Sequence, residues 1–197
     1  MVKKSEQTRL RIIDAANQLF YRQGYHSTSF SDIVHASSVP RGNIYYYYKS
    51  EDEVLEAVLK QRATRIQHML RGWNERYRTP MERLQRFLEL LPDSAESLCR
   101  YGCPLGSLNA ELGKLDTHLQ EQVKDLFKLF EDWLTDQFAE LGYAGSAREL
   151  ARHLLGRGQG IVMLAHVHAD RHFLQQETRL LKRWLDALAQ GNNPFDI

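Results

Sequence analysis

The stretch Val39–Ser50, with the sequence VPRGNIYYYYKS, combines residue types that bind nucleic acids. Tyrosine hydroxyls donate hydrogen bonds to phosphate oxygens, and contacts of this kind fix the register of a protein on DNA. Arg41 has the geometry to pair with guanine, and Asn43 has the geometry to pair with adenine. These residues predict a DNA-binding surface, on which Tyr45 and Tyr46 reach phosphates or base edges.

The four consecutive tyrosines cannot all face DNA if the stretch is helical, because successive residues of a helix point in different directions. Four buried hydroxyls would each need a hydrogen-bond partner, so a fully buried row is also disfavoured. We expect Tyr48 to belong to a small core. The pattern leaves Tyr47 open between core and surface.

The distribution of charge supports an anionic partner at one end of the chain. The net charge of the whole chain is only +1, but residues 1–50 hold seven Lys and Arg against three Asp and Glu. A basic segment on a near-neutral protein favours contact with a nucleic acid at that segment.

Three short helices should position these residues. Apolar residues at helical spacing predict a first helix over about residues 6–23, which Gly24 ends. Thr28 or Ser29 can cap a second helix, and Pro40 suits the first turn of a third. Such an arrangement is typical of a helix-turn-helix, whose last helix enters the major groove of double-stranded DNA.

The rest of the chain is also expected to be helical, so the predicted fold class is all-α. A capping box at Ser50–Glu53 begins a long helix, and the last two helices cover about 146–169 and 171–189. We expect a helix-turn-helix domain over residues 1–49 and a helical effector-binding and dimerisation domain over residues 50–197.

The chain has neither a long apolar run nor a signal-peptide pattern at its N-terminus. We therefore expect a cytoplasmic protein without a membrane partner. Its two cysteines would then lie in a reducing compartment, where a structural disulfide is disfavoured.

The first quarter of the chain resembles the N-terminal domain of the TetR family of transcriptional repressors over about residues 8–60. The resemblance rests on Ile12, Phe20, Gly24, Tyr25, Thr28, Ser29, Asp32, Ile33, Val39, Gly42, Asn43, Ile44, Tyr45, Tyr48, Lys49 and Ser50. It implies an all-helical homodimeric repressor on a palindromic operator. A variable C-terminal domain would bind a small-molecule inducer or an electrophile and release the DNA.

The resemblance also implies roles for individual residues. Three match positions that usually contact phosphates: Thr28, Tyr45 and Lys49. Three match positions that face base edges: Arg41, Asn43 and Tyr46. Glu51 departs from the family pattern because many relatives carry lysine there, which places more weight on Lys49 and on the arm Lys3–Lys4.

The last two helices are expected to form a four-helix dimer interface. Gly156, Gly158 and Gly160 are poor helix formers inside a helical run, and small residues allow close approach of helices. The glycines could instead mark a kink or a gap that faces a ligand. The predicted interface residues are Leu154, Gly158, Ile161, Leu164, Leu181 and Leu185.

Cys103 is the candidate sensor residue. It precedes a predicted short helix, whose unpaired amides would stabilise a thiolate, and Arg100 adds a nearby cation. Cys99 could resolve a sulfenic acid at Cys103. Some TetR-family repressors that respond to electrophiles and chlorine oxidants carry a similar Gly-Cys turn. The alternative is an inert, half-buried residue.

An ordinary apolar pocket is the other possible sensor. The aromatic residues that could line it, or could be plain core, are Trp73, Phe87, Phe127, Phe130, Trp133 and Trp184.

Metal binding and catalysis have little support in the sequence. His166, His168, His172 and Asp170 lie close together, but His168 does not share the helix face of the others and solvated histidines at a helix end explain the cluster. No catalytic motif is present, so we expect no enzyme, no metal and no cofactor. A helical adaptor that has lost DNA binding is the remaining alternative.

Overall fold

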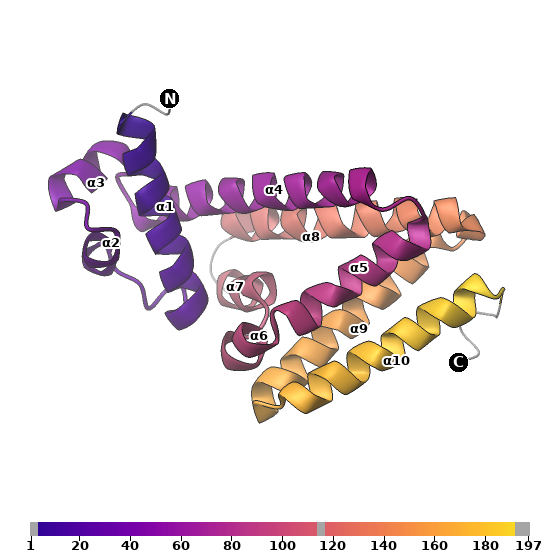
Figure 1. The fold of residues 1–197 in the computed structure, drawn as a ribbon. Helices are drawn as coiled ribbons and strands as arrows, with labels where there is room; N and C mark the ends of the chain where they lie inside the picture. Colours follow the sequence, from indigo (N-terminus) through magenta and orange to yellow (C-terminus); the bar gives the residue numbers. More distant parts are fainter. Residues whose placement is uncertain (1–3, 114–116, 192–197) are drawn as a thin grey trace. The chain divides into compact units, whose positions relative to one another are not determined.

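The computed structural model describes residues 4–113 and 117–191, and within these ranges it contains helices and no strand (Figure 1). The all-α prediction is confirmed. The elements are α1 (Lys4–Gln23), α2 (Phe30–Ser37), α3 (Arg41–Tyr47), α4 (Glu51–Arg76), α5 (Pro80–Asp93), α6 (Ala95–Tyr101), α7 (Pro104–Leu112), α8 (Thr117–Phe138), the π-helical turn η1 (Ala139–Tyr143), α9 (Ala147–His168) and α10 (Arg171–Ala189). None of the helices in the described part of the chain is long and apolar enough to cross a membrane.

The chain forms two compact units. Unit 1 holds residues 1–65 and 104–126, and unit 2 holds residues 66–103 and 127–197. Unit 1 is larger than the predicted domain of residues 1–49, because the first part of α4 and all of α7 belong to it. Polar contacts join α1 to α4 in this unit, for example the 3.1 Å hydrogen bond from Gln61 Nε2 to Asp14 Oδ1.

Local sequence signals explain the second helix of unit 1. Ser29 caps α2 by accepting a hydrogen bond from the Asp32 amide, and Asp32 accepts one from the Ser29 amide in return. Hydrogen bonds from Ser29 to the Asp32 carboxylate lower the pKa of that carboxyl group. Ser38 then ends α2 in the left-handed conformation, with φ of 53°. The turn between α2 and α3 is therefore specified by residues that are local in the sequence.

The core of unit 1 follows the predicted helical periodicity. Ile12 and Ala16 of α1 are fully buried, together with Ile33 of α2 and Ile44 of α3. Arg11 holds the turn between α2 and α3, since its guanidinium donates to the backbone oxygen of Ser37 at 2.7 Å. The small core therefore packs α1 to α3 together and leaves one side of α3 outside it.

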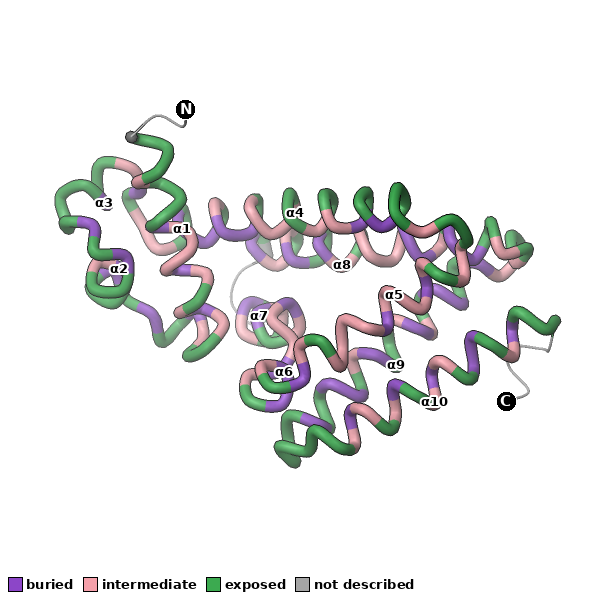
Figure 2. Tube along the Cα trace, in the orientation of Figure 1, coloured by how far each residue is buried: buried purple, intermediate pink, exposed green. Residues whose placement is uncertain are grey.

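Unit 2 is built around a second apolar core formed by α5, α6, α9 and α10, to which the later parts of α4 and α8 add buried residues. Each of these helices alternates buried and exposed positions along its length (Figure 2). Thr79 and Glu82 form a capping box at the start of α5, which carries the fully buried Leu84. On α10 the buried stripe contains Leu174, Leu181, Leu185 and Leu188.

Candidate nucleic-acid interface

The short helix α3 packs one side into the core of unit 1 and exposes the side chains of the other. Ile44 is fully buried and Tyr48 is 6% exposed, so the helix is fixed along one side. Arg41, Asn43 and Tyr46 lie on the exposed side. The structure therefore brings together the three residues that were predicted to face base edges.

The four tyrosines divide between core and surface. Tyr46 is 76% exposed and Tyr45 is 38% exposed, whereas Tyr48 is buried as predicted, and burial raises the pKa of its hydroxyl. Tyr47 is half-buried and its hydroxyl donates to Ser5 Oγ at 3.2 Å. Arg9 of α1 lies over Tyr47 and Tyr48, with 5.7 Å and 5.9 Å from the guanidinium carbon to the ring centroids. Tyr47 thus ties α3 to α1 and is not a free surface residue.

Tyr45 is held in place by two neighbours. Its ring stacks on Phe30 at the start of α2, with 4.9 Å between centroids and 15° between planes. On its other flank, the guanidinium of Arg41 donates to the Tyr45 hydroxyl at 3.3 Å, and this hydrogen bond raises the pKa of Arg41. Arg41 and Tyr45 are consequently pre-oriented as a pair on the exposed side of α3.

Lys49 and Glu51 lie where α3 leads into α4. The Lys49 ammonium donates to the backbone oxygen of Tyr45 at 2.6 Å, which uses one of its three donors and leaves the exposed amine able to bind a phosphate. The Glu51 carboxylate accepts a hydrogen bond of 3.3 Å from the Phe30 amide at the first turn of α2. Glu51 therefore occupies the positive end of α2, where an anion is favoured.

Thr28, for which the resemblance implies a phosphate contact, makes its hydrogen bond within the chain in this structure. This residue is buried, and its hydroxyl donates to the backbone oxygen of Gly24 at 2.7 Å. A hydroxyl has one proton and DNA phosphates only accept hydrogen bonds, so no donor remains for DNA in this arrangement. Thr28 therefore shapes the loop between α1 and α2 in this structure.

Arg11 supports the turn before α3, and the sequence analysis did not single it out for this role. It supports the turn from 26 positions away in the chain. No local signal marks such a contact, because a polar residue on an amphipathic helix has the same pattern whether or not it reaches a backbone carbonyl.

Comparison with known proteins agrees with this geometry. A family model described as bacterial regulatory proteins, tetR family, matches residues 12–58, and one described as the C-terminal domain of LmrA/YxaF-like transcriptional regulators matches residues 80–179. The uncharacterized HTH-type transcriptional regulator in the lacX 3' region of Lactococcus lactis subsp. lactis is 31% identical over 179 residues, which cover 89% of this chain and 91% of that protein. The chain belongs to the TetR family.

Other relatives extend over most of this TetR-family chain as well. The uncharacterized HTH-type transcriptional regulator YxaF of Bacillus subtilis is 27% identical over 170 residues, which cover 83% of this chain and 87% of YxaF. The crystal structure of a TetR transcriptional regulator from Legionella pneumophila superposes with a TM-score of 0.77 at 25% identity, covering 93% of this chain and 97% of that one. The protein is thus a helix-turn-helix transcriptional regulator, as the resemblance implied.

The two cysteines of this TetR-family regulator lie in different environments. Cys103 follows α6 directly before Pro104, the first residue of α7, and is half-buried against the core of unit 2. Cys99 is buried on α6, and burial, aided by the nearby Asp170 carboxylate, raises the pKa of its thiol. A raised pKa disfavours the thiolate that a resolving cysteine needs, so the environment of Cys99 does not support that predicted role.

The predicted dimer-interface residues need a correction. Leu154, Gly158, Ile161, Leu181 and Leu185 are buried inside the chain itself. The side chains of Leu154, Ile161, Leu181 and Leu185 therefore fill the core of unit 2 and are not offered to a second copy. Gly158 has no side chain, and nothing lies within 4 Å of where one would begin. Of the predicted set, only Leu164 is exposed, at 47%.

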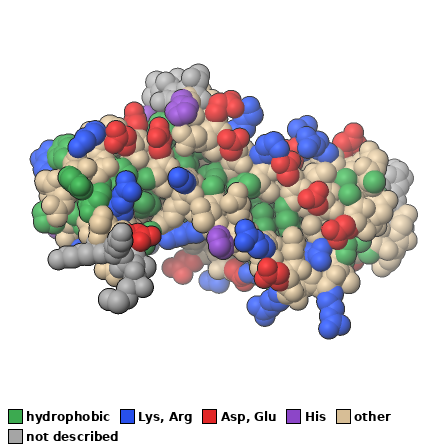
Figure 3. Space-filling model, turned by 90° about the horizontal axis from the view of Figure 1, so that it is seen from above, with side chains coloured by type: hydrophobic (Ala, Val, Ile, Leu, Met, Phe, Trp, Pro, Cys, Tyr) green, Lys and Arg blue, Asp and Glu red, His purple; other side chains and the backbone are tan. Residues whose placement is uncertain are grey.

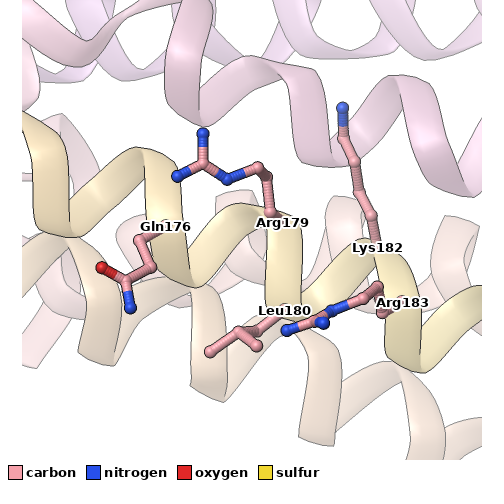
Figure 4. Close-up of a pocket in the computed structure, with 5 residues that line it drawn as sticks. All are labelled: Gln176, Arg179, Leu180, Lys182 and Arg183. Atoms are coloured by element: carbon pink, nitrogen blue, oxygen red, sulfur yellow. The ribbon is translucent and has the colours of Figure 1, made fainter.

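A different face of α9 is apolar and open. Met163 and Val167 are each 67% exposed, and with Leu164 they form an apolar stripe that we call the α9 stripe. Gly156 and Gly160 extend this stripe toward the start of the helix, and nothing lies within 4 Å of where their side chains would begin. On α10 an open groove is lined by Gln176, Arg179, Leu180, Lys182 and Arg183, with Arg179 and Lys182 extending toward the same side of the helix (Figure 4).

Most of the aromatic residues suggested for a pocket pack in or against the core of unit 2, whereas the histidine cluster is exposed where α9 ends and α10 begins. Trp73 and Trp133 meet edge to face at 5.6 Å between centroids, and the Trp133 indole donates to Asn74 Oδ1 at 2.9 Å. The Nδ1 atom of His166 lies 3.0 Å from the backbone oxygen of Cys99, and Asp170 caps α10. Within the described residues, no three His, Cys, Asp or Glu side chains are placed to share a metal ion.

Proposed function

We propose that this protein is a homodimeric repressor that acts in the cytoplasm on a palindromic operator of double-stranded DNA. The observation that carries the proposal is the exposed group Arg41, Asn43 and Tyr46 on α3, above the buried Ile44 and Tyr48. Arginine and asparagine on the exposed side of a third helix are suited to read guanine and adenine in the major groove.

Charge supports this assignment of the DNA-facing surface. The excess of Lys and Arg is confined to residues 1–50, whereas the chain as a whole has a net charge of +1. On the face displayed in Figure 3, acidic and basic side chains are interspersed. Phosphate neutralisation releases counterions, so binding through residues 1–50 should weaken steeply with salt.

The α9 stripe supports homodimerisation. Exposed apolar residues beside glycines suit a helix of a second copy, because small residues let backbones approach closely. A two-fold axis through such a face makes it self-complementary, since each residue of the stripe meets the same stripe in the partner. A dimer of this kind would present two copies of α3 to two half-sites.

Arg41→Ala should weaken operator binding by about 1–3 kcal/mol and relax sequence preference at one position of each half-site. Lys49→Ala is the matched control, because it also removes one exposed cation but should weaken all sequences equally and lower the salt slope by about one. Fluorescence anisotropy on operator and base-substituted duplexes, across a salt series, measures both effects. A preference that survives in Arg41→Ala would exclude Arg41 from base readout.

The effector is proposed to be a small-molecule inducer or an agent that modifies Cys103. The support for modification is the place of this residue, half-buried against the core of unit 2 and next to the glycine Gly102 in the chain. A bulky adduct on Cys103 would have to displace neighbouring side chains, and α7 follows at once in the chain.

Cys103→Ser should bind operator DNA with wild-type affinity and remain bound when a thiol alkylator is added. Cys99→Ser, the control, should still release DNA on alkylation because Cys103 is intact. The measurement is anisotropy of the reduced proteins before and after alkylation. Release by Cys103→Ser would refute the sensor role, and wild-type protein that stays bound would favour a reversible small-molecule inducer.

A further inference from the structure

A carboxylate of α7 binds the loop that joins α1 to α2. Glu111 Oε2 accepts hydrogen bonds from the backbone amides of Tyr25, at 2.8 Å, and His26, at 3.3 Å. Tyr25 and Glu111 are 86 residues apart in the chain, but both belong to unit 1. Successive amides that converge on one oxygen form the arrangement with which backbones hold anions, and here the anion is the protein's own side chain.

The backbone conformation of Gly24 and its lack of a side chain suit this contact. Its φ of 91° lies in the left-handed region that favours glycine. A side chain at this position would begin 3.0 Å from Glu111 Oε2, so any other residue would press against the carboxylate. The backbone conformation and the missing side chain both allow Glu111 to approach the loop.

Tyr25 also connects the loop to α4. Its hydroxyl donates to the Asp52 carboxylate, and its ring packs edge to face on Phe20 with 5.3 Å between centroids. Beyond His26 the chain passes through Thr28 to Ser29, the cap of α2. The position of this loop therefore sets where α2 begins, and α2 contacts α3.

The opposite end of α7 is tied to unit 1 as well. The Arg62 guanidinium donates from Nε to Asn17 Oδ1 at 2.7 Å and from a terminal nitrogen to the backbone oxygen of Pro104 at 2.9 Å. Pro104 begins α7 and Glu111 lies near its end. Thus α7 is attached to α1 and α4 at its start and to the loop at its end.

We propose that Glu111 is a positioning residue for DNA binding. It holds the loop of residues 24–26, and with it the start of α2, in the arrangement that presents α3 to DNA. The inference rests on the DNA-binding function proposed above. It also makes α7, which directly follows Cys103 in the chain, one of the segments that hold α2 and α3 in place.

The direction in which a substitution of Glu111 changes DNA affinity separates a positioning role from a purely electrostatic one. Removing an acid from a DNA-binding protein lowers the repulsion of phosphates and by itself strengthens binding. A lost positioning contact has the opposite effect, because the apparent affinity falls with the fraction of molecules in the competent arrangement.

Glu111→Ala should therefore bind the operator about ten-fold more weakly than wild type, as expected if about a tenth of the molecules keep the competent arrangement. Glu111→Gln keeps a carbonyl that accepts hydrogen bonds and should restore most of the affinity. The charge control is Glu121→Ala, which removes an exposed acid of the same unit that pairs with Lys124 at the surface, and it should bind as tightly as wild type or tighter. The full-length protein is titrated by anisotropy against a duplex selected from random sequence.

Hydrogen exchange tests the contact itself. The amides of Tyr25 and His26 should exchange faster in Glu111→Ala than in wild type, whereas amides in the middle of α1 should not change. Unchanged exchange at these two amides, or operator binding by Glu111→Ala that equals wild type, overturns the inference alone. A wild-type protein that binds no selected duplex overturns the proposed function, and the inference with it.

Discussion

Met163→Asp should convert the proposed dimer to monomers and abolish operator binding. Met163 is 67% exposed in the single chain, so aspartate at this position leaves the packing of unit 2 intact. In a dimer through the α9 stripe the new carboxylate would be buried without a partner, and a buried unpaired charge costs about 3–5 kcal/mol. Two-fold symmetry places this cost in both copies.

Sedimentation velocity reports the association state, and anisotropy reports operator binding at the same protein concentrations. Met163→Leu is the matched control, since it keeps an apolar side chain of similar volume and should remain dimeric. Dimeric Met163→Asp protein with normal thermal stability would show that the α9 stripe is not the interface. Monomers that still bind a full operator tightly would show that dimerisation is not needed for recognition.

Leu185→Ala should lower the free energy of unfolding by about 2–5 kcal/mol, the usual cost of a large-to-small change in a core. Leu185 is fully buried on α10, so its truncation leaves a cavity in the core of unit 2. Leu180→Ala on the same helix is the control, because Leu180 is half-buried beside the open groove and its loss should be well under half as large.

Urea unfolding, followed by circular dichroism, measures both variants. Protein concentration must be equal in all samples, because dimerisation makes apparent stability depend on concentration. If Leu185→Ala dissociated the dimer without loss of monomer stability, the original assignment of Leu185 to the interface would be correct and the core assignment wrong. Equal losses in the two variants would also contradict the core assignment.

Much of the candidate DNA-binding surface on α3 is determined by local sequence. Several of its signals act within a few residues and can be recognised from the sequence alone. They are the capping box of Ser29 and Asp32, Pro40 before α3, and the apolar spacing of Ile12 and Ala16. Helical periodicity likewise separates Tyr46 from Tyr48. For this reason the all-α class and the exposure of Arg41, Asn43 and Tyr46 followed from the sequence.

Helical periodicity predicts burial less well where a helix is apolar on more than one side. On α9 both the buried Leu154 and the exposed Met163 belong to apolar stripes. The pattern shows that such faces exist, but it does not say which one packs inside the chain, because burial depends on where α5, α6 and α10 lie. The structure therefore disagrees with the predicted interface at Leu154, Ile161, Leu181 and Leu185, whose side chains are buried inside the chain.

Contacts between distant segments were decided by the tertiary structure alone. Glu111 reaches Tyr25 across 86 residues, and Glu51 reaches Phe30 across 21. The sequence alone determined the helices, their caps and the side chains of α3 that face outward, since these depend on neighbours in the chain. Which carboxylate accepts hydrogen bonds from which backbone amides depends on how the finished helices pack, and only the fold contains that information.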